Sequence, residues 1–157
     1  MYAAIAVGVI IIGMSIFFVY SSEQAKMRGE AFSKAIEFIQ EDHKNHMYTF
    51  DSKVAMFKRG DISRDDFLKF AEKHQSEMEK IILRYDNLQT PKPFIPSVEL
   101  FRLSAETQFE SEKYTIEWIR TGDETAQIRA DQLWNQSIQY EQNALLEFNL
   151  VQRQTNP

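Results

Sequence analysis

The chain has 157 residues, of which 43% are hydrophobic and 26% charged, and its formal net charge at pH 7 is −5. These values exclude a mainly disordered chain, and the acidic balance excludes the basic surface with which proteins bind nucleic acids. Cysteine is absent. Its absence excludes disulfides, thiolate zinc sites, iron–sulfur clusters and cysteine nucleophiles.

The first predicted element is a membrane anchor. Residues 2–20 contain no charged side chain and are mainly apolar. As a helix this segment spans about 28 Å, close to the thickness of a bilayer core. Tyr2 and Tyr20 frame it, as amphipathic aromatic rings do at membrane interfaces. We therefore predict a transmembrane anchor over residues 1–20. A cleaved signal peptide is the alternative, although no Lys or Arg precedes the apolar core.

The orientation of this anchor follows from the charges that flank it. Lys26, Arg28 and Lys34 follow the segment, and positive flanks favour the cytoplasmic side. A glycosylation sequon at Asn135–Ser137 would matter only outside the cell. We predict a single-pass membrane protein, in contact with membrane lipid, whose larger domain is cytoplasmic. An extracytoplasmic domain stays open as the alternative.

Residues 21–157 are predicted to form a helical bundle domain. Glycine and proline are rare in it, and apolar side chains recur at spacings of three and four, which is typical of amphipathic helices. No stretch alternates long enough to predict a strand. The breakers separate four predicted helical segments: 21–59, 62–89, 97–121 and 123–155.

The short junctions between these segments carry helix-capping residues. Gly60 and Gly122 suit the left-handed position that follows a helix. Ser63 and Asp123 can cap the helices that come next. Because both turns are short, each pair of neighbouring helices is expected to form an antiparallel hairpin.

The predicted fold is therefore all-α, an N-terminal transmembrane helix followed by an antiparallel four-helix bundle. Its hairpins cover residues 21–89 and 97–155. The connector 90–96 is rich in proline, which predicts a stiff, extended link. Phe94 and Ile95 in this link are expected to pack back onto the bundle.

All three histidines lie on apolar stripes. Pivoting the first hairpin at its glycine turn puts His46 level with His74, and His43 lies one turn away. Met47 and Met78 lie next to these histidines, at about the same level of the hairpin. Imidazole and thioether are ligands for copper, and with an added carboxylate for zinc. Core packing is the first interpretation of these five residues, and a copper or zinc site is the second.

Two glutamates, Glu112 and Glu141, also interrupt apolar stripes. We expect both at the edge of the core, each paired with a Lys or Arg. The Glu-x-x-His motif of di-iron bundles is absent from the sequence, as are the phosphate-loop, metalloprotease and serine-hydrolase motifs. The sequence therefore predicts no catalytic residues and a protein that is not an enzyme.

The helical layout, the stretch Ser97–Ser104 (SVELFRLS) and the stretch Glu117–Gly122 (EWIRTG) resemble small single-span helical membrane proteins of ammonia-oxidising archaea. These organisms hold a membrane-bound ammonia monooxygenase with small helical accessory subunits. The resemblance implies a place in such a complex and assigns no residue a role.

Three function hypotheses follow. The first is a membrane-anchored, non-enzymatic interaction or accessory subunit of a membrane complex, with a protein partner or a second copy of itself and without nucleic acid. The second is a metal-binding or metal-delivery protein for copper or zinc, and no other cofactor is predicted. The third is a ligand-sensing helical bundle.

Overall fold

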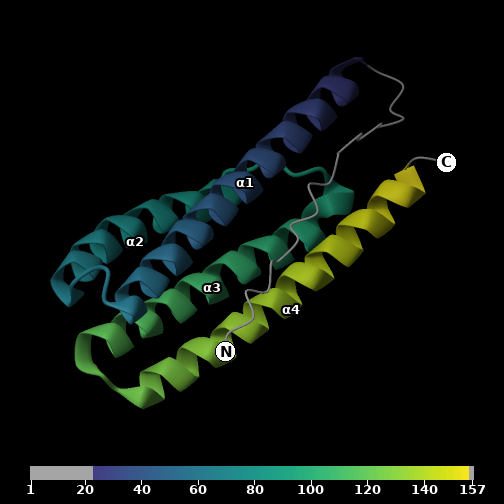
Figure 1. Cartoon of the computed structure of the whole chain (residues 1–157). Coiled ribbons are helices and arrows are strands. Elements are labelled where there is room, and N and C mark those ends of the chain that lie inside the picture. Colours follow the sequence, from purple (N-terminus) through teal and green to yellow (C-terminus); the bar gives the residue numbers. More distant parts are fainter. Residues whose placement is uncertain (1–22, 156–157) are drawn as a thin grey trace.

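The computed structural model describes residues 23–155. It contains the helices α1 (Glu23–Arg59), α2 (Arg64–Asp86), α3 (Ile95–Thr121) and α4 (Glu124–Thr155), and a short 3₁₀ turn η1 (Lys92–Phe94). The predicted all-α bundle of two hairpins is confirmed (Figure 1). The predicted anchor at residues 1–20 lies outside the described residues. None of the described helices is apolar enough over a sufficient length to cross a membrane.

The two hairpins lie one over the other, with α1 and α2 forming one layer and α3 and α4 the other (Figure 1). The contact between α2 and α3 joins the layers, whereas α1 and α4 share no comparably extensive contact within residues 23–155. The start of α1 and the end of α4 lie at the same end of the bundle (Figure 1).

Both predicted turns form as expected. Gly60 and Gly122 have φ values of 78° and 80°, the left-handed conformation that a side chain would strain. The hydroxyl of Ser63 accepts a hydrogen bond from the backbone N–H of Asp66, which caps α2. Asp123 accepts from the backbone N–H of Thr125 at the start of α4.

The connector differs from the prediction at its C-terminal end. Instead of staying extended to residue 96, the chain turns through η1, and α3 begins at Ile95. Pro96 fits in the first turn of α3 because an amide there has no partner within the helix. Phe94 is fully buried as predicted. Ile95, in contrast, is 41% exposed, because the first turn of α3 directs it outward.

A seam of small residues joins α3 to α4. Small buried side chains recur at every seventh position of both helices: Ser97, Ser104 and Ser111 in α3, and Ala130, Ser137 and Ala144 in α4. The Ser104 hydroxyl donates to the carbonyl of Ser137 at 2.9 Å, and the Ser111 hydroxyl donates to that of Ala130 at 2.8 Å. Hydrogen bonds from side chain to opposing backbone require a close approach of the two helices. The small residues permit that approach.

Enlarging one residue of this seam is expected to destabilise the fold. Ser111→Leu forces the two backbones apart and removes the bond to Ala130. The expected loss is about 2 kcal/mol of unfolding free energy. Denaturant titration of the full chain in mild detergent, followed by circular dichroism, measures it. Ser52→Leu, at an exposed position of α1, is the matched control and is expected to change stability by less than about 0.5 kcal/mol.

The buried apolar side chains form two clusters. The first core comprises Phe32, Ile36, Ile39, Met78, Ile81, Tyr85, Phe94, Val98, Phe101, Ala105, Phe109, Ala144 and Phe148. The second core comprises Phe50, Val54, Phe67, Ala71, Ile116 and Ile119. Between these two sets along the helices lie His43, His46, His74 and Glu112, which we call the polar layer.

Candidate functional site

The polar layer brings together two of the predicted histidines. The rings of His46 and His74 lie 5.7 Å apart between centroids, which confirms the predicted register of the first hairpin. His43 is buried one turn away on α1. Met78 is buried in the first core, and Met47 is half-buried. The five predicted ligands therefore lie in one region of the bundle without forming a single cluster.

A partner that sequence reasoning missed lies opposite His74. Nε2 of His74 lies 2.9 Å from Oε2 of Glu112, and the two side chains are 1% and 3% exposed. The expectation that Glu112 pairs with a Lys or Arg at the core edge is wrong. The reason is positional, because Glu112 faces α2 across the interface between the hairpins, and His74 stands there.

The buried position of Glu112 disfavours the negatively charged form of its carboxyl group. Burial raises its pKa, which His74 and the neighbouring Gln108 amide partly oppose. Its second oxygen, Oε1, has no hydrogen-bond partner among the described residues. Glu112 therefore keeps one strong bond, to His74, and one unsatisfied acceptor in the interior.

His43 is a second buried polar group with an unsatisfied atom. Its Nε2 lacks a hydrogen-bond partner within the described part of the chain. Burial, together with a smaller contribution from charge repulsion by the nearby His46 and His74, lowers its pKa from 6.5 to about 4. His43 is therefore neutral at pH 7.

Asp51 extends the polar layer toward solvent along α1. Its side chain is exposed, yet partial burial raises its pKa to about 6, and the negative charge of Glu112 contributes to the rise. Lys58 and His74 act in the opposite direction. Asp51 is therefore coupled electrostatically to Glu112 while its own side chain remains exposed.

The placement of the possible metal ligands can be compared with what a metal ion requires. Among the described residues, no three His, Asp, Glu or Cys side chains are placed to share one metal ion. Nδ1 of His46 lies 3.2 Å from the carbonyl oxygen of Asp42, and Nε2 of His74 faces Glu112. His43 alone has a ring nitrogen that is buried and unengaged. The metal site stays a prediction.

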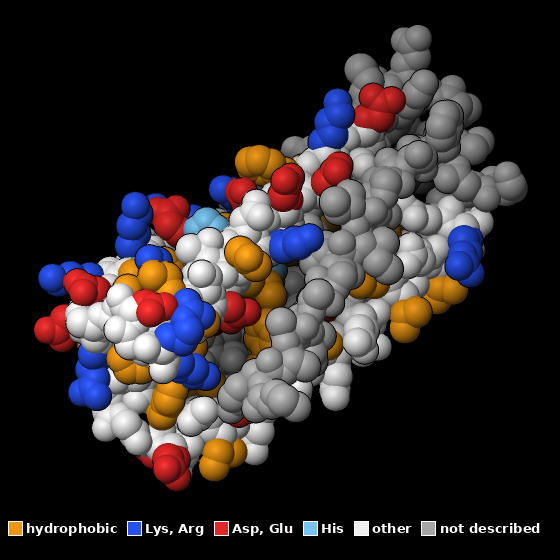
Figure 2. Space-filling model, in the orientation of Figure 1, with side chains coloured by type: hydrophobic (Ala, Val, Ile, Leu, Met, Phe, Trp, Pro, Cys, Tyr) orange, Lys and Arg blue, Asp and Glu red, His pale blue; other side chains and the backbone are white. Residues whose placement is uncertain are grey.

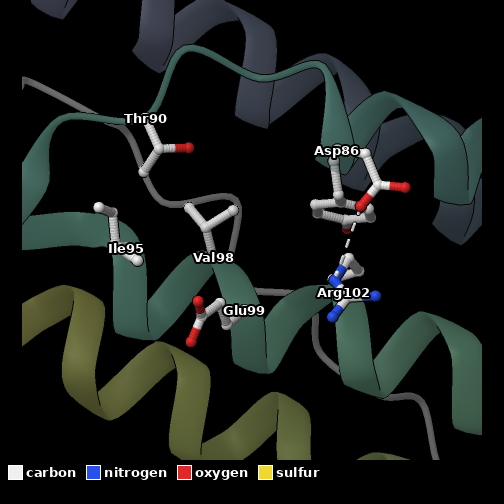
Figure 3. A pocket seen from close by; sticks show the side chains of 7 residues that line it. Asp86, Thr90, Ile95, Val98, Glu99 and Arg102 are labelled. Atoms are coloured by element: carbon white, nitrogen blue, oxygen red, sulfur yellow. Dashed lines mark ion pairs between the residues drawn. The ribbon is translucent and has the colours of Figure 1, made fainter.

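A shallow recess lies under the connector, between the end of α2 and the start of α3 (Figure 3). Thr90, Ile95 and Val98 line its apolar part, and Asp86 and Arg102 its far side. Arg102 lies 3.9 Å from Asp86 and also contacts Glu106 at 2.5 Å. The charge of Arg102 is thus neutralised by its neighbours, which leaves it poorly disposed to hold an anionic ligand.

Comparison of the chain with protein-family models, curated proteins and solved structures gave no significant match.

Proposed function

We propose that the protein is a membrane-anchored, non-enzymatic interaction or accessory subunit of a membrane complex. The observation that carries the proposal is a patch on the outer side of the first hairpin. Phe38 and Leu83 are 59% and 56% exposed, and the Arg84 guanidinium lies 5.3 Å from the centre of the Phe38 ring. Arg84 also forms an ion pair with Asp42.

The composition of this patch is that of protein-binding hot spots. Aromatic and arginine side chains dominate the energy of protein interfaces, and a pre-formed ion pair holds the arginine in place. Phe38 and Leu83 come from different helices and lie level in the hairpin register, so the patch is presented by a rigid support. These features favour docking of a protein partner.

The polar layer supports a structural role for its charged groups. A histidine–carboxylate pair can perform acid–base catalysis only where it meets a substrate. The His74–Glu112 pair is almost closed to solvent, which favours a role in joining the hairpins. The uncharged segment at residues 2–20 supports membrane anchoring.

Co-purification of the full chain from native membranes in mild detergent tests this proposal. We expect a stoichiometric protein partner that is lost from the double variant Phe38→Asp/Leu83→Asp. Tyr48→Asp is the control on the same helix, at a side chain that is 78% exposed outside the patch, and it is expected to retain the partner. A monomeric protein without a partner, or a folded double variant that keeps it, would refute the proposal.

A second candidate, metal binding or delivery, is favoured by one observation. His46 and His74 approach each other, and the neighbouring His43 has a buried nitrogen without a partner. Imidazole nitrogens are ligands for copper and zinc, and binding here would require these rings to rotate toward a common ion. Titration of the full chain with each metal tests this candidate. It fails if the variant with all three histidines changed to alanine binds as well as the original.

A further inference from the structure

The solvent-facing side of α4 carries no charge over most of its length. Helical periodicity groups these residues, all exposed, on that side: Ile128, Asn135, Gln139, Asn143, Leu146 and Leu150. Charged residues of the same stretch fall outside it. A solvated helix face normally carries charge, and 26% of this chain is charged. In Figure 2, white and orange atoms prevail along the α4 flank at the lower right, with few blue or red side chains.

The uncharged side of α4 is also nearly symmetric about its centre. Asn135 and Gln136 precede Gln139 at the same distances at which Asn143 and Gln142 follow it. The apolar ends obey the same symmetry, since Ile128 and Leu150 are equally far from Gln139. A helix face whose residue pattern reads the same in both directions can pair with the same face of a second copy that runs antiparallel to it.

We propose that α4 pairs antiparallel with α4 of a second copy of this chain, about a two-fold axis at Gln139. Helix geometry then puts Ile128 against Leu150 of the second copy. The amides of Asn135 and Gln136 come beside those of Gln142 and Asn143 of the second copy, where they form hydrogen bonds.

The flanks of this pairing are complementary in charge. Arg129 and Glu147 lie on the same side of the uncharged face, and the two-fold axis brings Arg129 beside Glu147 of the second copy. Each copy has a net charge of −5, which disfavours association in general, whereas this face carries no charge that would repel a second copy. The groove that Leu100 lines together with Leu146 and Leu150 gives the incoming Ile128 an apolar seat.

The absence of cysteine permits a direct test with the full chain in mild detergent. Gln139→Cys is expected to form a disulfide-linked dimer under a mild oxidant. Ile128→Cys alone and Leu150→Cys alone are expected to crosslink little, and an equal mixture of the two to crosslink well. Tyr48→Cys on α1, 78% exposed, is the control and is expected to stay monomeric.

A reversible measurement accompanies the crosslinking. In sedimentation equilibrium, Glu147→Arg is expected to weaken dimerisation severalfold because it faces Arg129 of the second copy. Arg129→Glu in the same chain is expected to restore it. Because Arg129 and Glu147 are both exposed, we expect each variant to fold, and circular dichroism checks this.

Three results would overturn this inference. One is crosslinking of Gln139→Cys no greater than that of Tyr48→Cys. Another is dimerisation of Ile128→Cys alone, which indicates parallel pairing. The third is a monomer in which the thiol introduced by Gln139→Cys is shielded only when another protein co-purifies, which assigns the face to that protein. The inference is independent of the partner patch at Phe38, because dimerisation and partner binding are measured on separate variants.

Discussion

Glu112→Ala is expected to lower the free energy of unfolding by about 3–5 kcal/mol at pH 7, the largest effect that we predict for one side chain. The change leaves His74 buried at the interface between the hairpins with no partner for Nε2. It also leaves a cavity where the carboxylate stood. Denaturant titration of the full chain in mild detergent measures the loss.

Two further variants separate the cost of an orphaned histidine from the value of the pair. Replacing both partners, His74→Leu with Glu112→Leu, is expected to cost far less than Glu112→Ala, because no buried polar group is left alone. Glu117→Ala breaks an exposed ion pair with Arg120 on the same helix and is expected to cost less than about 1 kcal/mol. A loss for Glu112→Ala no larger than that of Glu117→Ala would contradict the prediction.

The second large effect concerns pH and His43. Its pKa is about 4 in the folded protein against 6.5 in the unfolded chain, so the unfolded chain binds a proton more readily between these values. Folding stability from this residue is therefore fully present above pH 6.5 and is lost as pH falls toward 4. The loss is about 3 kcal/mol, at about 1.4 kcal/mol for each pH unit.

His43→Leu removes this proton linkage while filling the same space. Unfolding free energies of the two proteins, measured in metal-free buffer from pH 7.5 to 4, are expected to converge or cross in favour of the variant as pH falls. Asp51 acts in the opposite direction, because its pKa of about 6 lies above the ordinary 3.8 and folding gains as the carboxylate is protonated. Both proteins contain Asp51, so its effect cancels in the comparison. Parallel pH curves would refute the assignment to His43.

The parts of the fold that depend on local sequence could be predicted. Gly60 and Gly122 act through their own backbone conformation, and Ser63 and Asp123 through neighbouring amides. The level of His46 with His74 follows from a short turn and helical rise, so it too was within reach.

The parts that depend on how the hairpins meet could not be predicted. Which residue of α3 faces His74 is set by the packing of α2 on α3, and no local signal ties Glu112 to a residue 38 positions away. The exposed position of Ile95 was not predicted either. The connector was expected to stay extended through residue 96, whereas α3 already begins at Ile95 and directs that side chain outward. The seam of α3 and α4 was readable in principle, since its serines and alanines repeat at every seventh position.

This seam has a consequence for the order in which the chain folds. It joins two helices that are neighbours in sequence and separated by a two-residue turn, so closing it costs little chain entropy. The polar layer, in contrast, is completed only when distant segments dock and desolvate His74 and Glu112 together. We expect the amides of α3 and α4 to gain protection from hydrogen exchange first in pulse-labelled refolding, with docking of the first hairpin as the later step. Simultaneous protection of all four helices would contradict that order.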